Sequence, residues 1–181
     1  MKLHWQNKWL TRIRVRNTTL ARLLFHTGSL TRYIETECKS ALEVELKSES
    51  WQQPMPEEAD KLNVNLNEQA FVRESWLKSN NQYLIYARSI VPRQTYDQFS
   101  TQLNGLGTRP LGELLFADDS SYRAEMRYAR VPRDCLLFDA TVEHNVNMET
   151  LWARQSLFYI KDKPLLILEV FLPGIDQVLK C

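Results

Sequence analysis

The sequence lacks the features that define several large classes of protein. It contains no run of about eighteen apolar residues and no apolar stretch near the N-terminus, so we expect neither a membrane-spanning helix nor a secretory signal peptide. Five glycines and seven prolines among 181 residues are too few for a low-complexity or disordered chain. The formal net charge of +1 gives no reason to expect a nucleic-acid partner. We expect a single cytoplasmic domain over residues 1–181, monomeric by default.

Cysteine and histidine are also scarce. The three cysteines, Cys38, Cys135 and Cys181, are widely spaced and form no CxxC pair, and the three histidines show no metal-ligand spacing. The sequence has no GxSxG, no HExxH, no glycine-rich phosphate loop and no acidic metal cluster. We therefore expect reduced thiols, no metal and no nucleotide cofactor.

Hydrophobic periodicity predicts an α+β fold. Helical patterns, the first with a cluster of arginines on its expected solvated face, lie at residues 8–26, 29–34, 95–103 and 110–116. Alternating or continuous apolar patterns predict strands at residues 42–47, 69–78, 82–91, 122–131, 151–160 and 165–172. Two prolines and three acidic residues indicate a loop over 52–60. Because short turns join successive strands, we expect a single antiparallel β-sheet packed against helices.

Glu169 is the most informative single residue. It shares one strand face with Leu165, Ile167 and Phe171, and the opposite face of that strand is apolar throughout. A strand with two apolar faces is buried on both sides, so the carboxylate requires a cationic partner, hydrogen bonds or a proton. Glu169 is therefore a candidate catalytic group. The alternatives are a buried Glu–Arg pair without chemistry or a position at a sheet edge.

Arg73 has a similar setting, since Phe71 and Ser75 share its strand face. An inward guanidinium favours a carboxylate partner because its planar fork donates hydrogen bonds to two oxygens at once, although an internal salt bridge is the alternative. Arg88 and Arg154 are ambiguous between ligand contact and structural support. An inward glutamate and an inward arginine in one small sheet together predict a pocket for a small acidic molecule.

The turn at Leu111 and Gly112 opens the short helix that follows Pro110. Amides at a helix start have no intrahelical partner and carry partial positive charge. This turn could therefore hold a carboxylate; the alternative is that it only starts the helix and has no role in binding.

Several short pieces that carry these residues follow one another in a characteristic order. They are Gly-Ser-Leu-Thr-Arg at 28–32, Val-Arg-Glu at 72–74, Tyr-Ala-Arg-Ser-Ile-Val-Pro at 86–92, Pro-Leu-Gly-Glu-Leu-Leu-Phe at 110–116, Trp-Ala-Arg-Gln-Ser at 152–156 and Lys-Pro-Leu-Leu-Ile-Leu-Glu-Val-Phe-Leu-Pro at 163–173. In this order and spacing, from about Leu20 to Pro173, the chain resembles the chorismate–pyruvate lyases of ubiquinone biosynthesis.

The resemblance implies an antiparallel sheet packed against helices, with the ligand pocket covered by helical flaps. Arg73 and the Leu111 backbone amide would bind the ring carboxylate of chorismate, and Glu169 would face the hydroxyl end of the ring near the Leu30 backbone. The implied products are 4-hydroxybenzoate and pyruvate. Because substrate and product share the ring carboxylate, we also expect product inhibition. Arg88 and Arg154 are possible supporting residues.

The role of Glu169 stays open from sequence alone. A protonated Glu169 could assist departure of enolpyruvate, its anion could take the C4 proton, or it could only orient the hydroxyl during an intramolecular transfer. Two residues depart from the family pattern: Leu30 stands where methionine is frequent, and Gln155 stands where arginine is frequent. Whether Gln155 replaces a structural or a functional arginine is likewise open.

A non-catalytic role is the main alternative. The same fold serves as the effector-binding domain of some bacterial transcription regulators, where it normally follows a winged-helix segment. Residues 1–27 are too short for such a segment, and the presence of both Arg73 and Glu169 favours the lyase. A related lyase that supplies 4-hydroxybenzoate to another end product is a third alternative.

Overall fold

A six-stranded sheet forms the centre of the computed structural model, which describes residues 3–8, 11, 15, 18–38, 41–144 and 148–178. Its strands are β1 (Glu43–Gln52), β2 (Ala70–Ser79), β3 (Gln82–Pro92), β4 (Ser121–Pro132), β5 (Thr150–Ile160) and β6 (Lys163–Phe171). Every neighbouring pair is antiparallel, in the order β1-β2-β3-β6-β5-β4. The predicted α+β class with one antiparallel sheet is confirmed.

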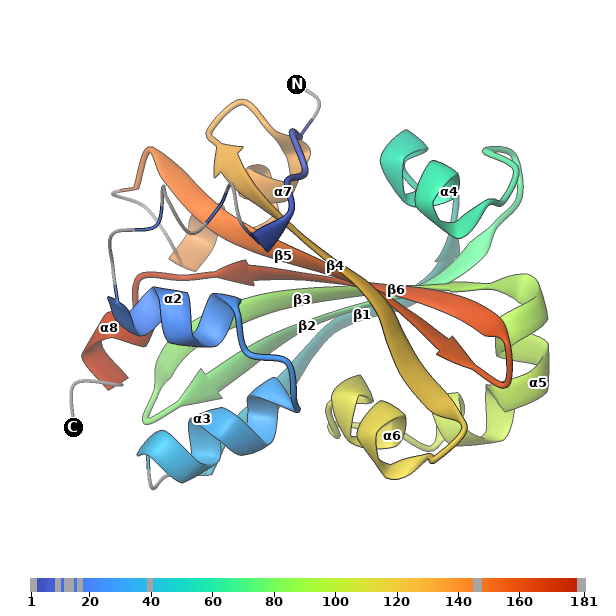
Figure 1. Cartoon of the computed structure of the whole chain (residues 1–181), viewed down its shortest axis with the longest axis horizontal. Coiled ribbons are helices and arrows are strands. Elements are labelled where there is room, and N and C mark those ends of the chain that lie inside the picture. Colours follow the sequence, from blue (N-terminus) through green and yellow to red (C-terminus); the bar gives the residue numbers. More distant parts are fainter. Residues whose placement is uncertain are drawn as a thin grey trace.

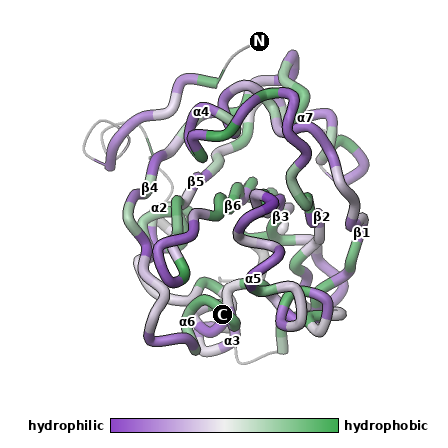
Figure 2. The backbone as a smooth tube through the Cα atoms, turned by 90° about the vertical axis from the view of Figure 1, so that its right-hand side faces the viewer, coloured by the Kyte–Doolittle hydropathy of each residue, from purple (hydrophilic) through white to green (hydrophobic). Residues whose placement is uncertain are grey.

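Helices cover both faces of the sheet (Figure 1). On one side lie α2 (Thr18–Leu24), α3 (Leu30–Cys38) and α6 (Leu111–Ala117), and on the other lie α4 (Pro56–Leu62) and α7 (Leu136–Asp139). Figure 2 shows these layers from the side, with β4 and β1 at the two edges of the sheet. The remaining elements are α5 (Arg93–Asn104), the 3-10 helix η1 (Val142–His144) and α8 (Ile175–Val178).

The chain order explains why β3 and β6 are central. Strands β1, β2 and β3 form a meander, after which α5 and α6 carry the chain to the far edge, and β4, β5 and β6 return to pair with β3. Both predicted hairpins are confirmed. Their turn residues, Asn80 and Asn81 in one and Lys161 and Asp162 in the other, all have positive φ between 44° and 64°. Such turns match the right-handed twist of antiparallel strands.

The predicted loop over 52–60 is wrong from Pro56 onward, where α4 begins. Proline is tolerated in the first turn of a helix because its missing N–H would have no partner there. Glu57 and Glu58 favour the same end through the helix dipole, and Glu58 Oε2 accepts a hydrogen bond of 2.9 Å from the Met55 amide. The acidic residues therefore mark a helix start rather than a loop.

The other helix predictions have mixed outcomes. The helix expected over 29–34 is α3, and the Ser29 hydroxyl caps it by accepting a hydrogen bond from the Arg32 amide at 3.4 Å. The helix expected from residue 95 is α5, which begins earlier, at Arg93; the Thr95 hydroxyl donates to the Pro164 carbonyl at 2.7 Å. Pro110 directly precedes α6, as predicted.

Part of the N-terminal prediction falls outside the described residues. Only α2 is described of the helix predicted over 8–26, and most of the arginine cluster (12, 14 and 16) lies outside. Cys135 is buried with a free thiol, whereas Cys181 and the side chain of Cys38 are not described. Among the described helices, none combines the length and apolar character that crossing a membrane requires.

Candidate active site

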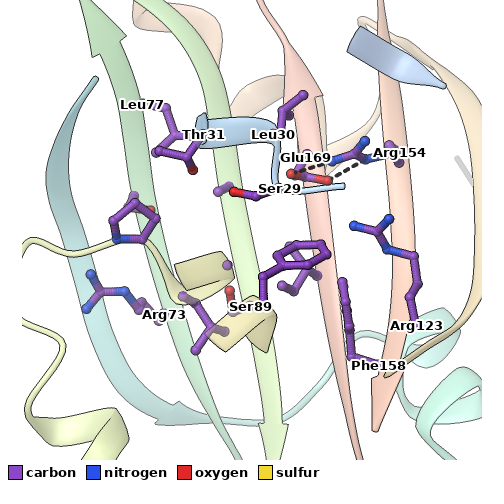
Figure 3. Close-up of a pocket in the computed structure, with 17 residues that line it drawn as sticks. Ser29, Leu30, Thr31, Arg73, Leu77, Ser89, Arg123, Arg154, Phe158 and Glu169 are labelled. Carbon is purple, nitrogen blue, oxygen red and sulfur yellow. Dashed lines mark hydrogen bonds and ion pairs between the residues drawn. The ribbon is translucent and has the colours of Figure 1, made fainter. Parts of the chain in front are cut away.

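One pocket gathers most of the residues predicted from the sequence (Figure 3). It lies between the sheet and the flap helices α3 and α6, which contribute Leu30 and Leu111 to its lining. Its charged lining residues are Arg73, Arg123, Arg154 and Glu169. The cavity measures about 50 Å³, whereas ligand pockets usually measure roughly 300–1,000 Å³. Binding an aromatic ring therefore requires the flap helices or the lining side chains to move.

Glu169 and Arg154 form a bidentate ion pair on neighbouring strands, β6 and β5, where they are register partners. Arg154 Nε donates to Glu169 Oε2 at 2.6 Å, and Arg154 Nη2 donates to Glu169 Oε1 at 2.9 Å. The exposed fractions are 9% for Glu169 and 1% for Arg154. Both oxygens of Glu169 therefore accept charge-assisted hydrogen bonds from one guanidinium. Of the three roles considered for Glu169, base or orienting group fits this arrangement directly.

Carbonyl groups of the last turn of α2 and of the α2–α3 connection complete the Arg154 site. Arg154 Nη1 donates to the Leu23 carbonyl at 3.3 Å and to the His26 carbonyl at 2.9 Å. These contacts tie the segment that precedes Ser29 and Leu30 to the floor of the pocket. The position of the α3 flap is therefore coupled to the same arginine that holds Glu169.

Arg73 is buried at the β2 side of the pocket, with 3% of its surface exposed. It forms an ion pair with Glu49, its register partner on β1. Its Nη2 donates to the carbonyls of Gly107 and Arg109 at 2.7 Å and 3.2 Å. Arg73 thus anchors the loop that leads into α6 and its first residue, Leu111. Glu49 itself is partly exposed, with 32% of its side-chain surface accessible.

Arg123 is the one charged residue of this pocket's described lining that the sequence patterns did not single out. Strand β4 is irregular between Arg123 and Glu125: Arg123 pairs with Phe158, and Glu125 already pairs with Leu157. Ala124 is therefore the extra residue of a β-bulge, which reverses the alternation of side chains. Arg123 enters the pocket, whereas simple alternation places it on the face of Glu125, which forms an ion pair with Lys61 of α4.

The surroundings of Arg123 are mostly apolar. Its guanidinium carbon lies 4.6 Å from the Phe158 ring centroid and 5.3 Å from that of Phe116. Nη1 donates to the Thr27 carbonyl, whereas Nε is buried and has no hydrogen-bond partner among the described residues. Burial, followed by the positive charge of Arg154, lowers the pKa of Arg123 to about 10.

Arg88 and Gln155 lie on the opposite face of the sheet. Arg88 donates to both oxygens of Glu58, at 2.8 Å and 3.2 Å, and to Glu74 Oε1 at 2.9 Å. Gln155 lines a second cavity, of about 320 Å³, beside α4 and α7. The substitution at position 155 therefore does not alter the lining of the pocket that holds Glu169.

None of the described residues that line the second cavity is basic, so this cavity offers no positive charge to an acidic ligand. Of its two acidic lining residues, Glu57 accepts hydrogen bonds from the Leu3 amide and the Trp5 indole, and Glu58 pairs with Arg88. Elsewhere in the described part of the chain, no three His, Cys, Asp or Glu side chains gather where they could hold a metal ion. The pocket with Arg73 and Glu169 is thus the candidate active site.

The lowered pKa of His26 predicts that the stability of the fold depends on pH. Burial, followed by the charges of Arg154 and Arg123, lowers the pKa of His26 below 6.5. The unfolded chain then binds the proton more readily, so the free energy of unfolding is expected to fall as pH decreases below about 6.5. Chemical denaturation at several pH values between about 7.5 and 5.5 measures this dependence.

The matched variant is His26→Gln, which removes the titrating group. It also removes the stacking of His26 on Tyr33, at 4.4 Å between ring centroids, but does so equally at every pH. The difference in unfolding free energy between wild type and variant is expected to shrink toward low pH. A difference that stays constant would contradict the assignment.

Two solved structures with a similar fold come from transcription regulators. The effector domain of PhnF from Mycobacterium smegmatis superimposes with a TM-score of 0.60 at 11% identity, over 82% of this chain and 91% of that one. A GntR-family transcriptional regulator from Bacillus cereus has a TM-score of 0.56 at 10% identity, over 73% of this chain and 92% of that one. At these identities the similarity shows the fold alone.

Sequence comparison is more specific. The family model described as chorismate lyase matches residues 2–179. A protein of Methylococcus capsulatus named probable chorismate pyruvate-lyase is 35% identical over 155 residues, which cover 86% of this chain and 95% of the relative. A Nitrosomonas europaea protein of the same name is 31% identical over 177 residues, covering 97% and 89%. With a match over nearly its whole length, the chain belongs to the chorismate lyase family.

Proposed function

We propose that this protein converts chorismate to 4-hydroxybenzoate and pyruvate, as the first committed step of ubiquinone biosynthesis in the cytoplasm. The observation that carries the proposal is the pocket itself, in which an inward arginine, Arg73, and an inward carboxylate, Glu169, lie beneath two flap helices. The names of the relatives at 31–36% identity support the same reaction.

The positions of the pocket residues support one orientation of the substrate. Arg73 and the first amide of α6, at Leu111, bind the ring carboxylate, since both offer N–H donors at that end. The C4 carbon with its hydroxyl then points toward Glu169 and the Leu30 backbone. In the reaction the C3–O bond breaks, the C4–H bond gives up its proton, and the enolpyruvate released becomes pyruvate by gaining a proton at its methylene carbon. The electron pair of the C4–H bond completes the aromatic ring.

Glu169 then has two alternative roles in the reaction. As a carboxylate paired with Arg154, it takes the C4 proton, or it accepts a hydrogen bond from the C4 hydroxyl and orients the ring for an intramolecular transfer. Product inhibition follows from the same geometry, because 4-hydroxybenzoate keeps the ring carboxylate and the hydroxyl that the two ends of the pocket bind. A pocket closed by helices also slows its release.

The direct test is to mix the purified protein with chorismate and follow pyruvate and 4-hydroxybenzoate together. We expect both to form in equal, catalytic amounts. Tight binding of chorismate or 4-hydroxybenzoate without turnover would instead support the effector-binding role to which the fold of the regulator domains points.

Arg73→Ala is expected to weaken 4-hydroxybenzoate binding by about 10- to 100-fold and to raise the KM for chorismate similarly, because a charge-assisted contact with the ring carboxylate is lost. The kcat is expected to change less. Equilibrium titration with 4-hydroxybenzoate and steady-state kinetics measure the two effects. Arg130→Ala, which removes an exposed arginine of β4, is the matched control. Equal effects of the two substitutions would contradict a role for Arg73 in binding.

A further inference from the structure

The charges of the pocket exceed what a ligand with one carboxylate requires. Three arginines and one glutamate line it. Glu169 compensates Arg154, and Glu49, from outside the lining, compensates Arg73. Among the described residues, no carboxylate forms an ion pair with the third arginine, Arg123. Arg123 as a residue is only partly buried, but its guanidinium lies beside two aromatic rings, and a desolvated cation without an anionic partner is costly. Its position in the pocket therefore requires an explanation.

Arg123 also keeps an unused donor. Its Nε is buried without a hydrogen-bond partner, and the two aromatic rings beside it supply no acceptor oxygen. Buried polar groups in proteins are nearly always hydrogen-bonded, and exceptions are often functional. The lowered pKa of Arg123 has the same origin, since burial and the charge of Arg154 outweigh the opposing effects of Glu169 and Tyr128.

The position of Arg123 limits what its partner can be. It lies beside the Glu169–Arg154 pair and across the pocket from Arg73 (Figure 3). If the ring carboxylate sits at Arg73 and the C4 hydroxyl at Glu169, the neighbouring C3 substituent must project from the Glu169 end of the ring. That substituent is the enolpyruvyl ether, which carries the second carboxylate of chorismate.

We propose that Arg123 binds the enolpyruvyl carboxylate and thereby distinguishes the dianionic substrate from the monoanionic product. This inference rests on the proposed function of the pocket. Arg123 also contacts both flaps, through the Thr27 carbonyl before α3 and the Phe116 ring of α6. Substrate bound at Arg123 is therefore held where the two flaps meet, and cleavage of the ether separates the ring from the carboxylate that Arg123 holds.

The test compares substrate and product in the same variants. Arg123→Met keeps an unbranched side chain but removes the charge, and we expect it to lower kcat/KM for chorismate by about 10- to 100-fold, mainly through KM. The dissociation constant of 4-hydroxybenzoate is expected to stay within about threefold of wild type, which corresponds to less than about 0.7 kcal/mol. Arg73→Met, the matched control, is expected to weaken both ligands.

Arg123→Lys provides a second variant in case the methionine variant folds poorly. It retains the charge without the planar fork, so we expect a smaller loss for chorismate and again little change for 4-hydroxybenzoate. A loss of similar size for both ligands in either variant would show that Arg123 only supports the pocket. An unchanged kcat/KM for chorismate in Arg123→Met would likewise overturn the proposal.

The proposed role of Arg123 can be tested separately from the proposed lyase activity. If the wild-type protein does not cleave chorismate, calorimetric titration with chorismate replaces the kinetic measurement. Weaker chorismate binding by Arg123→Met, with 4-hydroxybenzoate binding retained, would then support the second carboxylate site in a protein that is not a lyase. If wild type binds neither compound, both the proposed function and the role of Arg123 are wrong.

Discussion

Glu169→Gln is expected to lower kcat for chorismate cleavage by about 100- to 10,000-fold, the usual range for losing a proton-transfer group. The amide is nearly isosteric with the carboxylate but cannot accept the C4 proton. Because the proposed contacts of Arg73 and Leu111 hold the other end of the ring, the affinity for 4-hydroxybenzoate should fall much less. Single-turnover kinetics with excess enzyme separate the chemical step from slow product release.

The main alternative cause of such a loss is damage to the fold. Glu169→Gln removes the charge that compensates Arg154, and an unpaired buried charge is destabilising. Arg154 keeps its contacts with the carbonyls of Leu23 and His26, and the new amide oxygen can still accept one of its hydrogen bonds. Circular dichroism and 4-hydroxybenzoate titration therefore serve as controls for each preparation.

The Glu169→Asp variant distinguishes a base that takes the C4 proton from a group that only orients the ring. It preserves the charge and the pairing with Arg154 but withdraws the carboxylate from the ring by about one methylene group. A base must reach the C4 proton at hydrogen-bond distance, so this variant is expected to be nearly as slow as Glu169→Gln if Glu169 takes the proton. Turnover of Glu169→Gln close to that of wild type would exclude both acid and base chemistry at this residue.

The inward residues of regular strands could be predicted from the sequence. Glu169 and Arg73 lie on β6 and β2, where the alternation of side chains continues without interruption around them. Their faces are therefore fixed by the strand period alone. The hairpins could be predicted for a similar reason, because Asn80 and Asn81 tolerate the positive φ that a two-residue turn requires.

Arg123 could not be predicted in this way because it precedes the β-bulge at Ala124. One extra residue in a strand moves every later side chain to the other face, so the regular pattern of Glu125 and Arg127 misplaces Arg123. The pairing of Glu169 with Arg154 was also beyond sequence analysis. It depends on the register between β5 and β6, and the sequence patterns leave the cationic partner of Glu169 open.

Arg88 illustrates a third reason why the role of a residue could not be predicted from the sequence. Its partner Glu58 lies in α4, a segment whose two prolines were interpreted as a loop, so no inward carboxylate was expected there. In the structure Glu58 is 2% exposed, and Arg88 joins it to Glu74. Although burial alone raises the pKa of Glu74, hydrogen bonds from Tyr86, Ser48 and Arg88 outweigh it and hold that pKa below its usual value. Arg88 thus completes a buried polar network behind the sheet.

Arg88→Met is therefore expected to lower the free energy of unfolding by about 3–5 kcal/mol, because it leaves the Glu58 carboxylate buried and unpaired. Urea denaturation measures the loss. The ligand affinity of the molecules that stay folded should not change, since Arg88 and the pocket lie on opposite faces of the sheet. A stable variant that binds 4-hydroxybenzoate poorly would contradict this assignment and place Arg88 in the binding site.

The double substitution Arg88→Met with Glu58→Met provides the control. If the loss comes from an uncompensated charge rather than from missing packing, removing the second charge should recover much of it, as buried ion pairs can often be replaced by apolar residues at little cost. A double variant whose loss equals the sum of the two single losses would show that the pair is not coupled. The coupling energy thus measures how far Glu58 satisfies the charge of Arg88 within the fold. Arg73 differs from Arg88 in that its carboxylate partner, Glu49, is partly exposed rather than buried.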